Sequence, residues 1–254
     1  LRAAVKQHVK DLGVAMRGHL VHWDVLNEPF DNHDLMDLLG EDVMVEWFKE
    51  ARAADPNALL FINDYAILSG GGGSTAHRDH YERTIRFLIQ AGAPLDGIGM
   101  QGHFGAALTS PDDLLAILDR YARFDKPIWV TEFDVDIDDE ELAGRYLTDF
   151  YTTLFSHPAV GGILMWGFWD GAHWKKNAPL YRQDWSLKPA GQAYRDLLLR
   201  DFRTEPSGKT DASGTFRTRG FFGSYEIAVR RAGRSRTQLV NLGPGDSSVV
   251  VSLE

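Results

Sequence analysis

Short runs of apolar, β-branched and aromatic residues recur along the first four-fifths of the chain, and each is followed by a longer amphipathic stretch. The short runs are typical of buried strands and cover Leu20–Val25, Ala58–Asn63, Gly97–Gln101, Ile128–Glu132 and Gly162–Gly167. The longer stretches have helical spacing and cover Glu41–Ala54, His77–Ala91, Pro111–Arg123, Asp139–Phe155 and Pro189–Arg200. Repeated strand–helix units predict an α/β fold with a parallel sheet, whose functional loops follow the carboxyl ends of the strands.

The pattern changes after Arg203. Residues 204–214 are rich in Gly, Ser, Thr, Asp and Pro and read as a linker. Short alternating runs then predict strands at Gly214–Gly220, Gly223–Arg230, Thr237–Leu242 and Ser248–Leu253, with turns at 232–233 and 243–246. We therefore expect an α/β domain over residues 1–202 and a small β-sheet module over 203–254, which we interpret as a structural appendage.

The amino-acid composition excludes several kinds of site and partner. The chain has 254 residues, 44% of them hydrophobic and 25% charged, which is an ordinary globular balance. It has no cysteine, so disulfides and thiolate sites are excluded, and no apolar run is long enough for a membrane helix. The net charge of −9 argues against nucleic acid and anionic membranes as partners. The sequence begins at Leu1 without a signal-peptide pattern, and we expect a processed or excised piece.

Two of the predicted strands end in glutamates. One run closes with Asn27-Glu28 and the other with Thr131-Glu132. A charge at the end of an apolar strand is costly unless it faces water or partners in a cleft, and a parallel sheet places both carboxyls at the same rim. Neighbouring runs bring His103 and a tryptophan-rich stretch to this rim. Two carboxyls with polar and aromatic groups around them predict acid-catalysed cleavage of a sugar acetal.

The order of these runs along the chain resembles that of a known enzyme family. Residues 23–28, Trp-Asp-Val-Leu-Asn-Glu, resemble the acid/base strand of the family 10 glycoside hydrolases, the endo-β-1,4-xylanases of the large barrel clan. Residues 131–135 resemble that family's nucleophile strand, and residues 62–65 and 97–103 match the two strands between them. Trp166, Asp170 and Trp174 fit the last strand and the loop after it. The resemblance covers about residues 1–200 and implies an α/β fold of the (β/α)8 TIM-barrel type.

The resemblance also implies roles for individual residues. Glu28 becomes the general acid/base and Glu132 the nucleophile of a retaining endo-1,4-β-xylanase, with the two carboxyls about 5–5.5 Å apart. Asn27 would hold the sugar 2-hydroxyl, and His103 would hydrogen-bond Glu132. The implied substrate-binding set is Asn27, Tyr65, Gln101, His103, Trp166 and Trp174. Xylan or xylo-oligosaccharide is the implied substrate, with no cofactor and no metal.

The chain departs from the family at its start. Family members begin with three further strand–helix units, and nothing in residues 1–19 matches their motifs. We therefore expect a partial barrel of about five units whose edge strands expose unpaired backbone. A second copy of the chain or the missing N-terminal half could cover these edges.

Other interpretations remain open. A sister-family cellulase or mannanase also carries the Asn-Glu-Pro motif found at residues 27–29. The missing units leave room for a catalytically impaired xylan-binding or structural remnant. His77 and His80 have the spacing of metal ligands, but without a third ligand nearby we expect no metal site. A polymeric substrate predicts a secreted or periplasmic protein.

Overall fold

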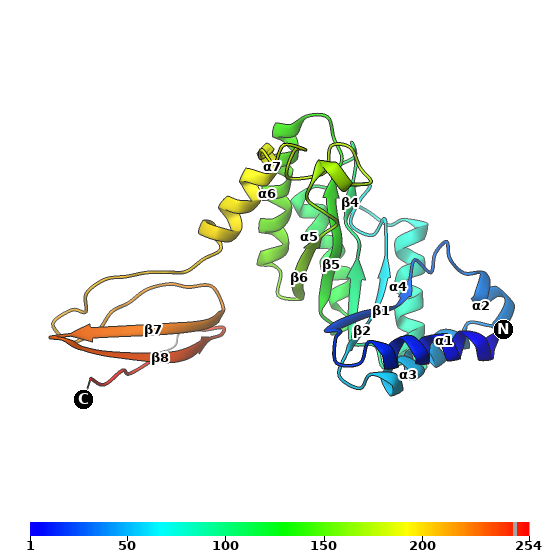
Figure 1. The fold of residues 1–254 in the computed structure, drawn as a ribbon, viewed down its shortest axis with the longest axis horizontal. Helices are drawn as coiled ribbons and strands as arrows, with labels where there is room; N and C mark the ends of the chain where they lie inside the picture. The colour runs from blue at the N-terminus through cyan, green and yellow to red at the C-terminus, as the bar shows by residue number, and fades with distance from the viewer. Residues whose placement is uncertain (246–247, 254) are drawn as a thin grey trace. The chain divides into compact units, whose positions relative to one another are not determined.

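The computed structural model describes residues 1–245 and 248–253. The chain divides into two compact units, Leu1–Tyr194 and Arg195–Glu254 (Figure 1). No helix within the described residues has the length and apolar character needed to cross a membrane.

The first unit is built on a parallel sheet. Its strands are β1 (His22–Asn27), β2 (Leu59–Asp64), β3 (Gly97–Met100), β5 (Ile128–Val135) and β6 (Val160–Met165), hydrogen-bonded in that order. A two-residue strand, β4 (His103–Phe104), pairs with the end of β5. Neighbours in sequence are thus neighbours in the sheet, as repeated strand–helix units require. The predicted parallel sheet is confirmed.

Helices precede, separate and follow the strands of this sheet. They are α1 (Arg2–Ala15), α2 (Asp34–Leu39), α3 (Asp42–Ala54), α4 (Ala76–Gln90), α5 (Pro111–Ala122), α6 (Glu140–Ser156) and α7 (Pro189–Asp196). The Ser110 hydroxyl caps α5 by accepting the Asp113 N–H, and Pro111 occupies the first turn, where its missing N–H costs nothing. The short helix α2 was not predicted from the sequence. The last helical prediction is partly wrong, because α7 ends at Asp196 and a π-helical turn, Leu197–Asp201, follows it.

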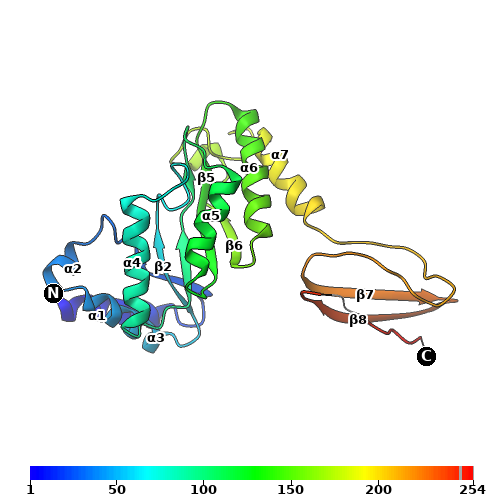
Figure 2. The ribbon, with the colours of Figure 1, turned by 180° about the vertical axis from the view of Figure 1, so that it is seen from behind.

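Among the described residues of the first unit, the helices α4, α5 and α6 cover one face of the sheet. Figure 2 shows α4, α5 and α6 standing on that face. Fully buried side chains such as Phe48, Ile85, Leu118 and Phe150 pack there, and burial of each stabilises the fold by about 1.5–3 kcal/mol. The opposite, concave face contains a hollow of about 180 Å³ lined by side chains of β1, β2, β5 and β6, namely His22, Asp24, Phe61, Trp129, Thr131 and Leu164.

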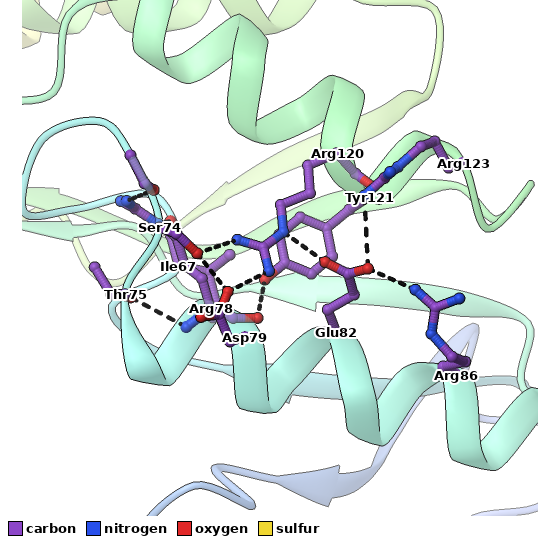
Figure 3. A network of polar contacts seen from close by, with 11 residues as sticks. Ile67, Ser74, Thr75, Arg78, Asp79, Glu82, Arg86, Arg120, Tyr121 and Arg123 are labelled. Carbon is purple, nitrogen blue, oxygen red and sulfur yellow. Dashed lines mark hydrogen bonds and ion pairs between the residues drawn. The ribbon is translucent and has the colours of Figure 1, made fainter.

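Charged side chains join α4 to α5. The Arg120 guanidinium bonds both Asp79 and Glu82 at 2.6 Å, and Glu82 also pairs with Arg86 (Figure 3). Beside them lies Arg78, which is fully buried. Its guanidinium donates to four backbone carbonyls of the glycine-rich loop after β2, those of Ile67, Ser69, Gly71 and Gly73. One buried arginine therefore fixes the loop that leads into α4.

The second unit contains a two-stranded antiparallel hairpin, β7 (Gly223–Arg231) and β8 (Arg234–Leu242). Ala232 and Gly233 turn it with positive φ values of 48° and 81°, which suit a tight hairpin turn. The strands predicted at 214–220 and 248–253 are wrong. Residues 214–219 are all exposed, so they have no apolar face to bury against a neighbour. The predicted turn at 243–246 lies partly outside the described residues.

Candidate active site

Glu28 follows the last residue of β1 in an unusual backbone conformation. Its φ is +54°, in the left-handed region that non-glycine residues seldom adopt, which makes it a strained position. Backbone hydrogen bonds from Asp31 and Asn32 to the Glu28 carbonyl close a tight turn after it. The carboxylate accepts the Gln101 amide at 2.6 Å and the Asn32 amide at 3.1 Å. Two donors therefore fix the orientation of the Glu28 carboxyl.

Glu132 lies in β5, with a side chain 13% exposed. One oxygen accepts the Asn63 amide at 3.2 Å, and the other lies 3.2 Å from His103 Nε2. The other nitrogen of this histidine, Nδ1, lies 3.0 Å from the buried Asp134 carboxylate. Burial opposes a charge on His103, but the neighbouring carboxylates of Asp134 and Glu132 outweigh it and raise its pKa to about 9. A positively charged imidazole between two carboxylates therefore holds Glu132 at neutral pH.

Two amide residues connect the glutamates in a reciprocal way. Asn63 accepts the Glu28 backbone N–H on its carbonyl at 2.9 Å and donates its side-chain amide to Glu132. Gln101 donates its side-chain amide to Glu28 and accepts the Glu132 backbone N–H on its carbonyl at 2.8 Å. Both residues are buried. The two carboxyls are thus positioned against each other through β2 and β3.

The remaining predicted residues lie around this pair. Asn27 is exposed and accepts the second amide hydrogen of Asn63 at 3.0 Å. The ring of Trp174 lies 4.8 Å from that of His103, and its indole N–H donates to Asp134 at 2.9 Å. Trp166 also faces His103, at 6.4 Å between ring centroids. Both tryptophans are about half exposed, so their rings are open to a ligand.

Tyr65 lies on the other side, beside the turn that follows Glu28. Its hydroxyl donates to Asp31 in that turn, and this hydrogen bond raises the pKa of Tyr65 to about 12. The structure therefore joins Glu28, Gln101 and Glu132 with His103, Asn27 and both tryptophans in one network. Tyr65 contacts the same site through the turn and through the ring of His77, 4.5 Å away between ring centroids.

The sequence did not predict the buried pair Asp64 and His77, which lies behind this turn. Asp64 is fully buried and lies 2.9 Å from His77 Nε2. The His77 ring stacks on Phe30, two residues beyond Glu28, at 4.1 Å. Burial raises the pKa of Asp64 to about 6, and His77 opposes the rise. His77, which the sequence offered only as a weak metal ligand, thus supports the Glu28 turn.

Asp134 and Asn63 were also missing from the predicted site residues. Both lie near the carboxyl end of a strand, within motifs quoted in the sequence analysis. The feature that could have identified them as site residues is a polar side chain within an apolar strand. Within the described part of the chain, no cluster of three or more potential ligand side chains could hold a metal ion.

A further carboxyl lies on the concave face near Glu132. The Asp24 side chain reaches solvent, but surrounding side chains desolvate it and, with the charge of Glu132, raise its pKa to about 6. Asp24 is part of the hollow and has no role in the predicted site.

Comparison with known proteins decides the family. The sequence profile of glycosyl hydrolase family 10 matches residues 1–197. The chain belongs to this family. The fold is accordingly a partial TIM barrel, as the resemblance of the motifs implied, and the five strands form an arc of the barrel.

Relatives of this family 10 chain include proteins of different kinds. Anti-sigma-I factor RsgI6 of Acetivibrio thermocellus is 34% identical over 251 residues, covering 98% of this chain and 32% of that protein. Endo-1,4-beta-xylanase 1 of Arabidopsis thaliana is 32% identical over 255 residues, covering 100% of this chain and 27% of that protein. The chain thus spans about a third or less of these relatives.

Solved structures give the same fold. Native xylanase 10B from Thermotoga maritima superposes with a TM-score of 0.70 at 27% identity, covering 79% of this chain and 67% of that one. The family 10 chain therefore shares the strand–helix arrangement of a xylanase over most of its length.

Proposed function

We propose that this chain carries the catalytic centre of a retaining endo-1,4-β-xylanase. The observation that carries the proposal is the reciprocal contact of Asn63 and Gln101 with Glu28 and Glu132. Such contacts hold two carboxyls at one rim in fixed relation, which acetal cleavage with two carboxyl groups requires. The xylanase relatives support the substrate class.

The two glutamates would divide the chemistry. The ionised Glu132 carboxylate attacks the anomeric carbon while the protonated Glu28 gives its proton to the leaving glycosidic oxygen. Glu28 then takes a proton from water, whose oxygen displaces Glu132 and releases the sugar with its configuration retained. For this mechanism we expect the two carboxyls to lie about 5–5.5 Å apart.

His103 supports the role of Glu132. Its positive charge faces the carboxylate that attacks the anomeric carbon in this mechanism. Because Asp134 binds the other ring nitrogen, the imidazole is held in one orientation. We assign His103 as the group that orients the Glu132 carboxylate.

The other predicted residues would bind sugar. Asn27 presents an exposed amide next to Glu28 for a ring hydroxyl, and Trp166 and Trp174 offer half-exposed ring faces on the side of Glu132. Tyr65 and Gln101 would complete the polar contacts. Because the substrate is a polymer too large to enter a cell, we place this activity outside the cell or in the periplasm.

The test is release of reducing sugar from three polymers: xylan, cellulose and mannan. Activity on xylan well above that on the other two supports the proposal. Preference for cellulose or mannan would assign the chain to a sister activity. Binding of xylan by a folded chain without turnover would favour the remnant interpretation instead.

A further inference from the structure

We propose that Trp169 and Trp185 form a second carbohydrate-binding platform, separate from the Glu28–Glu132 centre. The proposal rests on the proposed function for its ligand, a β-1,4-linked xylan chain. The two indole rings are stacked, with centroids 5.2 Å apart and an interplanar angle of 13°. Trp166 and Trp174, in contrast, turn their rings toward His103 in the catalytic site.

A closed turn presents Trp185. The Arg182 N–H donates to the Ser186 carbonyl, and the Trp185 N–H donates to the Arg182 carbonyl, each at 2.9 Å. The Asp184 carboxylate accepts both the N–H and the hydroxyl of Ser186. Trp169 is tied to the same turn by its indole N–H, which lies 3.3 Å from the Gln183 carbonyl. The platform is therefore ordered before any ligand arrives, which lowers the entropic cost of binding.

The conformation of Trp185 is costly for a bulky residue. Its φ is +66°, in the left-handed region where glycine is the favoured residue. Strain at such a position is commonly stored at ligand sites. Glycine would fit this backbone conformation better than tryptophan. The backbone therefore does not explain the tryptophan at position 185, and we look to its side chain for the explanation.

The exposure of the Trp185 ring indicates that the side chain is available to a ligand. Trp185 is 58% exposed and the neighbouring Phe168 is 53% exposed. Adjacent exposed aromatic rings mark a binding surface, whereas single exposed apolar residues are ordinary. Flat indole faces fit the apolar C–H face of a pyranose ring, while polar side chains at the edge bind its hydroxyls.

The polar edge of the platform favours a neutral ligand. Gln183, Asp184 and Ser186 flank Trp185 in the turn, and all three are exposed. Hydrogen bonds from Ser186 lower the pKa of Asp184, which keeps this carboxylate negative at neutral pH, while the charge of Arg182 in the same turn is paired with Glu140. A negative edge repels nucleic acid and other polyanions but accepts hydroxyl donors. An uncharged xylan chain meets both conditions.

The experiment compares two readouts for Trp185→Gly. Binding to insoluble xylan is measured by co-sedimentation in a Glu132→Gln background, so that the polymer is not consumed. Hydrolysis of a short soluble xylo-oligosaccharide is measured without that background substitution. Glycine suits the local backbone, so the variant is expected to keep its fold, checked by its thermal transition. We expect the affinity for insoluble xylan to fall by about three- to tenfold while oligosaccharide hydrolysis stays unchanged.

Three further variants sharpen the result. Trp185→Phe keeps a flat ring and should retain most of the affinity. Phe222→Ala removes an exposed ring from the other unit and should leave binding unchanged. Trp174→Ala should lower oligosaccharide hydrolysis, because its ring faces the catalytic site.

Unchanged sedimentation of Trp185→Gly, or no binding of insoluble xylan by the parent chain, would overturn the platform. An equal loss of oligosaccharide hydrolysis would place Trp185 in the catalytic cleft and remove the second site. Trp185-dependent binding by a chain that hydrolyses nothing would retain the platform while the proposed enzymatic function fails.

Discussion

Buried amides decide the geometry of the site at the scale of single residues. Asn63 is fully buried and has all its side-chain groups bonded, since its oxygen also accepts the Thr131 hydroxyl at 2.8 Å. Its position depends on Gly99, because a Cβ atom there would lie 2.6 Å from the Asn63 oxygen. Loss of such a buried amide leaves partners unsatisfied and costs about 1–3 kcal/mol. The contact of the Asn63 side chain with Glu132 therefore depends on a glycine in the next strand.

His103 makes stability depend on pH. Its pKa of about 9 in the folded chain exceeds the ordinary value of 6.5, so the folded state holds the proton more tightly. Its stabilising contribution, on the order of 2–3 kcal/mol, is complete below about pH 6.5 and is lost as the pH rises through about 9. We expect His103→Gln to flatten the fall in the free energy of unfolding across this window.

The measurement is urea denaturation at several pH values. His19→Gln, at an exposed histidine, is the control and should keep the parent's dependence. A His103→Gln chain with the same slope as the parent between pH 6.5 and 9 would contradict the charged imidazole.

At the scale of elements, α4 organises the rim after β2. The Thr75 hydroxyl caps this helix by accepting the Arg78 N–H (Figure 3). The Arg78 side chain holds the loop before it through four carbonyls. On the same helix His77 supports the Glu28 turn through Phe30. One helix N-terminus thus fixes two rim segments.

Arg78→Met should loosen this loop. The methionine keeps much of the apolar stem but removes every donor, and we expect a loss of about 2–4 kcal/mol in the free energy of unfolding. Residues 67–75 should also become more sensitive to proteolysis, which limited digestion with mass spectrometry would detect. Arg83→Met, at an exposed position of the same helix, is the matched control and should change little. Equal stability and equal digestion of the two variants would contradict this role for Arg78.

Elements were largely predictable from the sequence, and the site only in part. Strand–helix alternation gave the parallel sheet because apolar periodicity reports burial directly. The strands expected at 214–220 and 248–253 failed, since alternation without a buried face does not specify pairing. The stacking of the His77 ring on Phe30 could not be predicted from the sequence. The two residues lie 47 positions apart, and only the packing of the folded chain brings their rings together. Motifs placed the glutamates, but spacing alone does not reveal which amides connect them.

At the scale of the whole molecule, the important feature is a sheet with two edge strands, each unpaired on one side in the described part of the chain. Within the described residues β1 pairs only with β2, and β6 only with β5, so both strands present free backbone edges. Val21, just before β1, is 75% exposed and Leu164 in β6 is 48% exposed. Apolar strand edges of this kind pair readily with another chain.

We therefore predict that the chain self-associates at micromolar concentration. Light scattering coupled to size exclusion should give a mass above the monomer. Val21→Lys places a charge beside the β1 edge and should shift the population toward monomer. A monomeric mass for the parent chain would exclude self-association.

The most direct test of the catalytic assignment is reducing-sugar release from xylan by this chain beside Glu132→Ala. Removal of a catalytic nucleophile should lower the rate by at least about a thousandfold. Turnover by the parent that vanishes in the variant is the predicted result. Turnover that survives in Glu132→Ala, or no turnover by a correctly folded parent chain, would contradict the account.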